Sequence, residues 1–151
     1  MKKLAYTTVI DAPREIVWDR MLAPATYERW TTAFAEGSRY EGSWAEGARI
    51  LFLGPEDGSG MVSMIEANRR PAFLSILHLG MVKDGVEDTT SDAVKAWAGA
   101  HENYTFTEKG GGTGLTVELD VAPEFEGYMN ETWPKALALL KEICEEPPAA
   151  G

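Results

Sequence analysis

The stretch FEGYMNETWPKALALLKEIC, residues 125–144, decides the fold of this 151-residue chain. In an α-helix, side chains three and four residues apart lie on the same face. Apolar residues recur mostly at those steps, and charged or polar residues occupy the opposite face, so the stretch predicts an amphipathic helix. Pro134 is expected to bend or delay this helix, because proline removes one backbone hydrogen bond and its ring clashes with the preceding turn. The apolar positions are Phe125, Met129, Trp133, Ala136, Leu137, Leu140 and Ile143.

The remainder of the chain predicts strands, together with two short helices near the N-terminus. Pro13–Leu22 and Ala25–Trp30 are the expected helices, since proline suits the first turn of a helix and Pro24 separates the two. From Gly37 to Ala122, short apolar runs alternate with turn residues, as in antiparallel strands joined by tight turns. The predicted strands are Lys3–Ile10, Arg39–Ser43, Ala48–Leu53, Met61–Ala67, Ala72–Val82, Asn103–Glu108 and Leu115–Val121.

Together these elements predict an α+β domain with a helix-grip fold, in which a curved antiparallel β-sheet wraps around the long C-terminal α-helix. Residues 1–146 are expected to form this single domain, and residues 147–151 a flexible tail. Lys83 to Gly99 is expected to be mainly loop, with Ser91 capping a short helical turn. A turn is predicted at residues 54–58, where Asp57-Gly58 is a strong hairpin signal.

The charge balance argues against two classes of partner. Fourteen lysine and arginine residues against 24 aspartate and glutamate residues give a net charge of −10. Nucleic acids and anionic membranes both attract basic surfaces, so we expect neither partner. No apolar run approaches the ~20 residues that span a bilayer, and Lys2-Lys3 is not followed by the apolar core of a secretory signal. The single cysteine, Cys144, fits a reducing compartment, so a cytoplasmic protein is expected.

Neither a metal nor a cofactor is predicted. His78 lies within an apolar strand and His101 just before another, without the partner at ligand spacing that a zinc site needs. The acidic stretch from Asp84 to Asp92 fails the calcium-loop pattern. Residues 110–114 are glycine-rich, but they join two strands, whereas a phosphate-binding loop opens a helix. Structural roles are therefore expected for these residues.

Several motifs resemble one family. IDAPREIVW at 10–18, followed by YERW at 27–30, resembles the opening of the activator-of-heat-shock-protein-ATPase-like branch of the START/birch-pollen-allergen (SRPBCC) superfamily. GMV at 60–62, ENY at 102–104 and WPKAL at 133–137 are similar to later landmarks of that branch. The resemblance implies a seven-stranded or similar sheet curled around the helix, with a cavity between them. It implies no shared catalytic motif, and one fold hosts many activities.

The leading functional hypothesis is a module that binds a small apolar or aromatic ligand in this cavity. Aromatic residues and methionines make an adaptable apolar lining, and a few polar groups orient the ligand. The candidate ligand-binding residues are Trp30, Met64, His78, Trp97, Tyr104, Met129 and Trp133.

An enzyme and a co-chaperone are the two alternatives to a binding module. An enzyme of the same fold, a cyclase or hydrolase, would use a polar cavity residue, for which His78 and Tyr104 are the visible candidates; no catalytic residue is assigned. A co-chaperone of a heat-shock ATPase is suggested by the family name, although we expect such a protein to carry a separate N-terminal domain that this chain does not show. A homodimer is left open.

Overall fold

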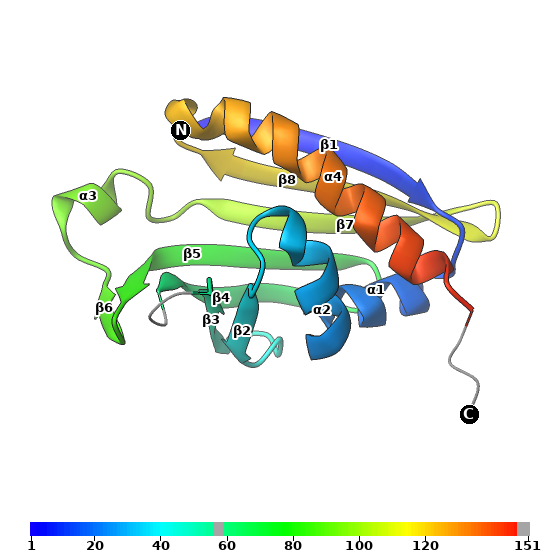
Figure 1. Ribbon diagram of the computed structural model, residues 1–151, viewed down its shortest axis with the longest axis horizontal. Coiled ribbons are helices and arrows are strands. Elements are labelled where there is room, and N and C mark those ends of the chain that lie inside the picture. Colours follow the sequence, from blue (N-terminus) through cyan, green and yellow to red (C-terminus); the bar gives the residue numbers. More distant parts are fainter. Residues whose placement is uncertain (56–58, 148–151) are drawn as a thin grey trace.

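Within residues 1–55 and 59–147, which this computed structural model describes, eight antiparallel strands form one curved sheet. The sheet order is β1-β8-β7-β5-β4-β3-β2, and the short β6 pairs with β5 beside this path (Figure 1). The first strand of the chain therefore pairs with the last strand through backbone hydrogen bonds. The strands are β1 Lys2–Ile10, β2 Arg39–Gly42, β3 Arg49–Leu53, β4 Gly60–Arg69, β5 Phe73–Lys83, β6 Val86–Asp88, β7 His101–Lys109 and β8 Gly112–Val121.

Three of the helices, α1, α2 and α4, gather on one face of this sheet, whereas the short α3 lies near one end of β5 (Figure 1). The long C-terminal helix α4 lies across the sheet, and α1 and α2 pack against one another and against α4 (Figure 1). No helix in the part of the chain that the structure describes is long and apolar enough to cross a membrane. The α-helices are α1 Arg14–Leu22, α2 Pro24–Trp30, α3 Asp92–Lys95 and α4 Glu126–Glu145, with short 3-10 turns at Thr31–Ala33 and Pro123–Phe125.

The apolar stripe of α4 packs on the inward side chains of the sheet, which confirms the predicted helix-grip fold. Along β8, Leu115, Val117 and Leu119 are buried at alternate positions, because successive side chains of a strand point to opposite faces. From α4, the buried apolar side chains include Trp133 and Leu140.

Pro134 lies inside α4, which runs unbroken from Glu126 to Glu145. The prediction that this proline delays the helix is therefore wrong, whereas a bend stays a prediction. An interior proline costs about 3 kcal/mol. Burial of a single large apolar side chain contributes roughly 1.5–3 kcal/mol. The free energy gained by burying the apolar side chains beside Pro134, which include Trp133 and Leu137, is thus sufficient to offset the cost of the proline.

The segment between β5 and α3 contains a strand, so the prediction that Lys83 to Gly99 is mainly loop is wrong for this part. Val86–Asp88 forms strand β6, paired with β5 so that Lys83 faces Val86 across a two-residue turn. Asp84 and Gly85 both have positive φ, 51° and 77°, as the tight hairpin turns that join twisted strands require. Ser91 caps α3 as predicted, its side chain accepting from the Val94 N–H at 3.3 Å. The predicted Asp57-Gly58 turn and the tail from residue 148 lie outside the described residues.

A β-bulge in β5 sets which side chains face α4. Ser63 pairs with His78, but the preceding Val62 pairs with Gly80, so Leu79 is an extra residue on β5. His78 and Met81 consequently line the same cavity although they are three residues apart, a spacing that normally places side chains on opposite faces.

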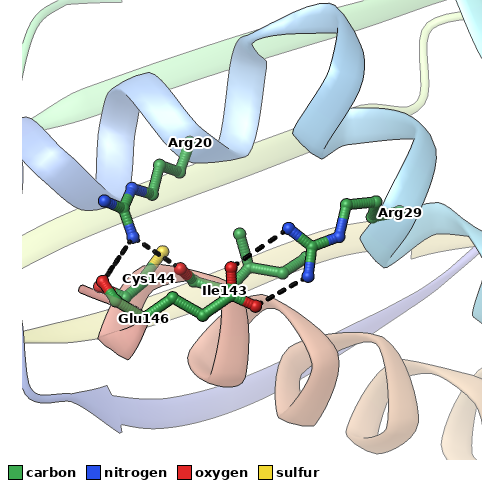
Figure 2. A network of polar contacts seen from close by, with 5 residues as sticks. All are labelled: Arg20, Arg29, Ile143, Cys144 and Glu146. Carbon is green, nitrogen blue, oxygen red and sulfur yellow. Dashed lines mark hydrogen bonds and ion pairs between the residues drawn. The ribbon is translucent and has the colours of Figure 1, made fainter. Parts of the chain in front are cut away.

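The C-terminus of α4 is fixed by two arginines from the short helices (Figure 2). The last four carbonyls of a helix lack intrahelical partners and carry partial negative charge. Arg20 of α1 donates from one nitrogen to the carbonyls of Ile143 at 2.6 Å and Glu146 at 3.0 Å. Arg29 of α2 forms a two-bonded ion pair with the Glu146 carboxylate, at 3.2 and 2.7 Å. These bonds hold α1 and α2 against α4.

Replacing Arg20 with alanine is expected to lower the free energy of unfolding by about 1–3 kcal/mol, because partly buried carbonyls lose a charged donor. Arg29→Ala is the control, since it removes the same charge from an exposed ion pair with Glu146, and exposed pairs contribute little. Urea unfolding measures both variants. Equal losses in the two would show that net charge, and not capping of α4, explains the effect.

Candidate functional site

Two adjoining cavities lie between the sheet and α4. The first, the aromatic chamber, has a volume of about 270 Å³. The second, the outer chamber, has a volume of about 710 Å³. The two chambers share the lining residues Met61, His78, Glu102, Leu119 and Met129. The first chamber is lined by seven aromatic side chains of the described residues, those of Tyr27, Trp30, Phe34, Trp44, Phe52, Tyr104 and Trp133.

A chain of polar contacts crosses the sheet at the junction of the chambers. His78 Nδ1 lies 2.7 Å from the hydroxyl of Ser63, its register partner on β4. On the other side of the ring, His78 Nε2 lies 3.2 Å from Oε1 of Glu102 on β7, and the Tyr104 hydroxyl donates to Oε2 of the same carboxylate. Glu102 and Tyr104 are two residues apart on one strand, so their side chains share a face.

These contacts set the charge of the cluster. Burial raises the pKa of Glu102, but the hydrogen bond and charge of His78, with the bond from Tyr104, outweigh it, so this pKa lies below its ordinary value of 4.5. Burial, and then the neighbouring Glu102 carboxylate, hold the pKa of Tyr104 well above 10. At neutral pH the junction therefore presents a carboxylate supported by a neutral phenol.

Lysine and arginine side chains supply no positive charge in the chambers that could pair with an anionic ligand. Among the described residues, neither side chain lines either chamber, whereas Asp120 adds a second carboxylate to the outer one. No group of three or more His, Cys, Asp and Glu residues in ranges 1–55 and 59–147 could hold a metal ion.

The comparisons with known proteins bear on the fold. No protein-family model and no curated protein matches the chain. Among solved structures, the Aha1 dimer from Colwellia psychrerythraea matches with a TM-score of 0.73 and 14% identity, over 96% of this chain and 97% of that chain. An AHSA1-like protein from Aeromonas hydrophila matches with a TM-score of 0.67 and 17% identity, over 99% and 100% of the two chains. Protein MLL2253 from Mesorhizobium loti matches with a TM-score of 0.71 and 18% identity, over 94% and 96%. This chain has the AHSA1-like fold. The resemblance drawn from the sequence is thus confirmed for the fold.

The AHSA1-like fold brings most of the sequence-predicted site residues together. Five of the seven line the aromatic chamber, and Trp97, next to α3, lines the outer chamber instead. Those five are Trp30, His78, Tyr104, Met129 and Trp133. Their role in binding stays a prediction.

Met64 lines neither chamber, so we withdraw it from the candidate site. It lies between Ser63, which contacts His78, and Ile65, which is buried in the main core. Because neighbouring side chains of a strand point to opposite faces, Met64 points away from α4, beside its register partner Leu77.

Glu102 is the site residue that the sequence analysis missed. The predicted strand began at Asn103, which left Glu102 in a loop, whereas β7 begins at His101. The alternation of strand side chains contained the signal, since any strand that turns Tyr104 inward also turns Glu102 inward.

Glu102→Gln is expected to lower the free energy of unfolding by about 1–3 kcal/mol at neutral pH, because buried donors lose a charged acceptor. Glu102 has a depressed pKa when folded, so its contribution is complete above pH 4.5 and is lost as the pH falls below that value. The deficit of the variant should therefore shrink in acid. Denaturant unfolding across this range measures it, with Glu118→Gln on the exposed face of β8 as control. A deficit independent of pH would contradict an ionised, paired Glu102.

Proposed function

We propose that the protein binds a small apolar or aromatic molecule in the two chambers. The observation that carries this proposal is the open aromatic chamber of about 270 Å³ beside a helix already packed against the sheet. Empty space in a core loses packing energy, roughly 24 cal/mol for each Å³ of cavity. Rings that surround such a space gain contacts when an apolar guest fills it.

The outer chamber provides an entrance for such a guest. Met81, Phe125 and Tyr128 line it with 42%, 53% and 47% of their surface exposed. Large apolar side chains left exposed in one place are typical of a binding surface. Since the two chambers share lining residues, a molecule that enters between these three lies next to the aromatic chamber.

A second candidate function is an enzyme acting within the cavity, and the hydrogen-bonded cluster of His78, Glu102 and Tyr104 favours it. A carboxylate held next to a histidine is suited to move a proton to or from a bound molecule. The raised pKa of Tyr104 keeps its proton in place, so we assign the acid–base role to His78 and Glu102. Turnover of a candidate substrate that is unchanged in a His78→Ala, Glu102→Gln double variant would discriminate against this function.

Two partner hypotheses from the sequence stay predictions. A heat-shock ATPase as partner would show as stable association and faster ATP hydrolysis in a pull-down and activity assay. A second copy of this chain as partner would show as a dimer in sedimentation experiments; the protein from Colwellia psychrerythraea is described as a dimer.

Naphthalene-sized apolar ligands are expected to raise the melting temperature and change tryptophan emission, because a guest of the native state stabilises it by mass action. Met129→Ala should weaken binding about three- to tenfold, since Met129 lines both chambers. Met64→Ala is a matched control, half-buried but outside both chambers, and should leave binding unchanged. Neither thermal shift nor emission change with a broad apolar panel would overturn the proposed function.

A further inference from the structure

We infer that the ligand of these chambers carries a hydrogen-bond donor, a hydroxyl or an ammonium group, that binds Glu102 at their junction, and that it carries no negative charge. This inference rests on the proposed function and specifies the chemistry of the molecule bound. It follows from the position of one carboxylate, from the charges around it and from the aromatic walls.

Glu102 is placed to contact a molecule in either chamber, because it lines both of them. Its side chain keeps 22% of its surface exposed although its neighbours are largely buried. Within the structure, Oε1 contacts His78 and Oε2 accepts from Tyr104. A carboxylate oxygen has two lone pairs, so each of these oxygens has capacity for a further donor. A ligand hydroxyl or ammonium group at the junction would use it.

The surrounding charges disfavour an anionic ligand. Glu102 and Asp120 line the outer chamber, and no lysine or arginine from the described residues lines either chamber. His78 already contacts the Glu102 carboxylate, and the phenol of Tyr27 stays neutral because burial raises its pKa. His101 also lines the outer chamber, but its ring already lies beside the carboxylates of Glu66 and Asp120. A carboxylate ligand would therefore be desolvated next to Glu102 without a cationic partner of its own, which is costly in an apolar site.

The faces of the aromatic rings act in the same direction, whereas the buried N–H groups of Trp44 and Trp133, which have no hydrogen-bond partner among the described residues, suit a neutral acceptor on the same ligand. The face of an aromatic ring is negative and its edge positive, so an ammonium group that meets a ring face in this chamber is attracted. Tyr27, Trp44 and Phe52 lie within 6.4 Å of one another in centroid distance and line this chamber together. A cationic head group is therefore accommodated beside Glu102 as well as a neutral hydroxyl, and a test must separate the two.

Four probes with one ring system provide that test on the unaltered protein. They are naphthalene, 2-naphthol, 2-naphthylmethylammonium and 2-naphthoate, and tryptophan emission reports binding. One charge-assisted hydrogen bond is expected to make the dissociation constant of 2-naphthol, or of the ammonium probe, about tenfold lower than that of naphthalene. Whichever donor binds more tightly identifies the charge of the head group. 2-Naphthoate should bind at least about tenfold more weakly than 2-naphthol.

Glu102→Gln assigns the preference to this residue. In that variant the advantage of the donor probes over naphthalene should fall to about twofold, because a neutral amide is a weaker acceptor than a carboxylate. Glu118→Gln makes the same charge change outside the chambers and should keep the full preference. If Glu102→Gln does not fold, the four probes on the unaltered protein still test whether a donor is preferred over an uncharged apolar ring and over an anion.

The outcomes separate this inference from the proposed function. Equal binding of naphthalene and the donor probes, or binding of 2-naphthoate as tight as that of 2-naphthol, would overturn the inference and leave the proposed function standing. A preference that survives in Glu102→Gln would overturn the assignment to Glu102. Absence of binding by all four probes would overturn both.

Discussion

The rest of the structure depends on the packing of Trp133 against four aromatic rings from other parts of the chain. Its ring lies 6.2 Å in centroid distance from each of Tyr6, Trp30 and Tyr104, and 5.1 Å from Phe34. These contacts join α4 to β1, α2, the segment after it and β7, elements distant in the sequence. Rings of this size bury much apolar surface, and each pair adds roughly 0.5–1.5 kcal/mol. The aromatic chamber lies beside these rings, because it is lined by Trp30, Phe34, Tyr104 and Trp133.

The apolar walls and the polar cluster depend on each other. Inside a low-dielectric chamber, hydrogen bonds to a carboxylate are stronger than in water, and an unpaired carboxylate is far more costly. Glu102 is tolerated there because His78 and Tyr104 supply partners and Ser63 holds the far side of the histidine ring. The bulge at Leu79 makes this arrangement fit, since it allows His78 to face its partners while Met81 still faces the outer chamber. The same few strand positions therefore determine the geometry of the sheet, the charge of the polar cluster and the lining of the outer chamber.

The sequence alone identifies the buried face of a helix or strand wherever apolar residues recur with the regular period of that element. The stripe of α4 and the alternation of β8 each identify their buried face without knowledge of neighbours. Local patterns fail where the period is interrupted, because the bulge in β5 leaves no mark in the residue order and His78 and Met81 are not expected on one face. Met64 is a different case, since the regular alternation of β4 between Ser63 and Ile65 already places it on the face away from α4. Glu102 lies outside the predicted strand because that strand starts at Asn103, two residues after the observed start of β7 at His101. The β6 hairpin was missed although Asp84-Gly85 is a turn signal, because β6 is short and polar.

The most direct test of a ligand-binding chamber at this site is a crystal structure of the protein grown with 2-naphthol. We expect electron density for the ring system between the sheet and α4, in contact with Trp133 and Met129, and its hydroxyl within hydrogen-bond distance of Glu102. A crystal structure at saturating 2-naphthol in which side chains fill the chamber and no density for the probe lies between the sheet and α4 would contradict this account.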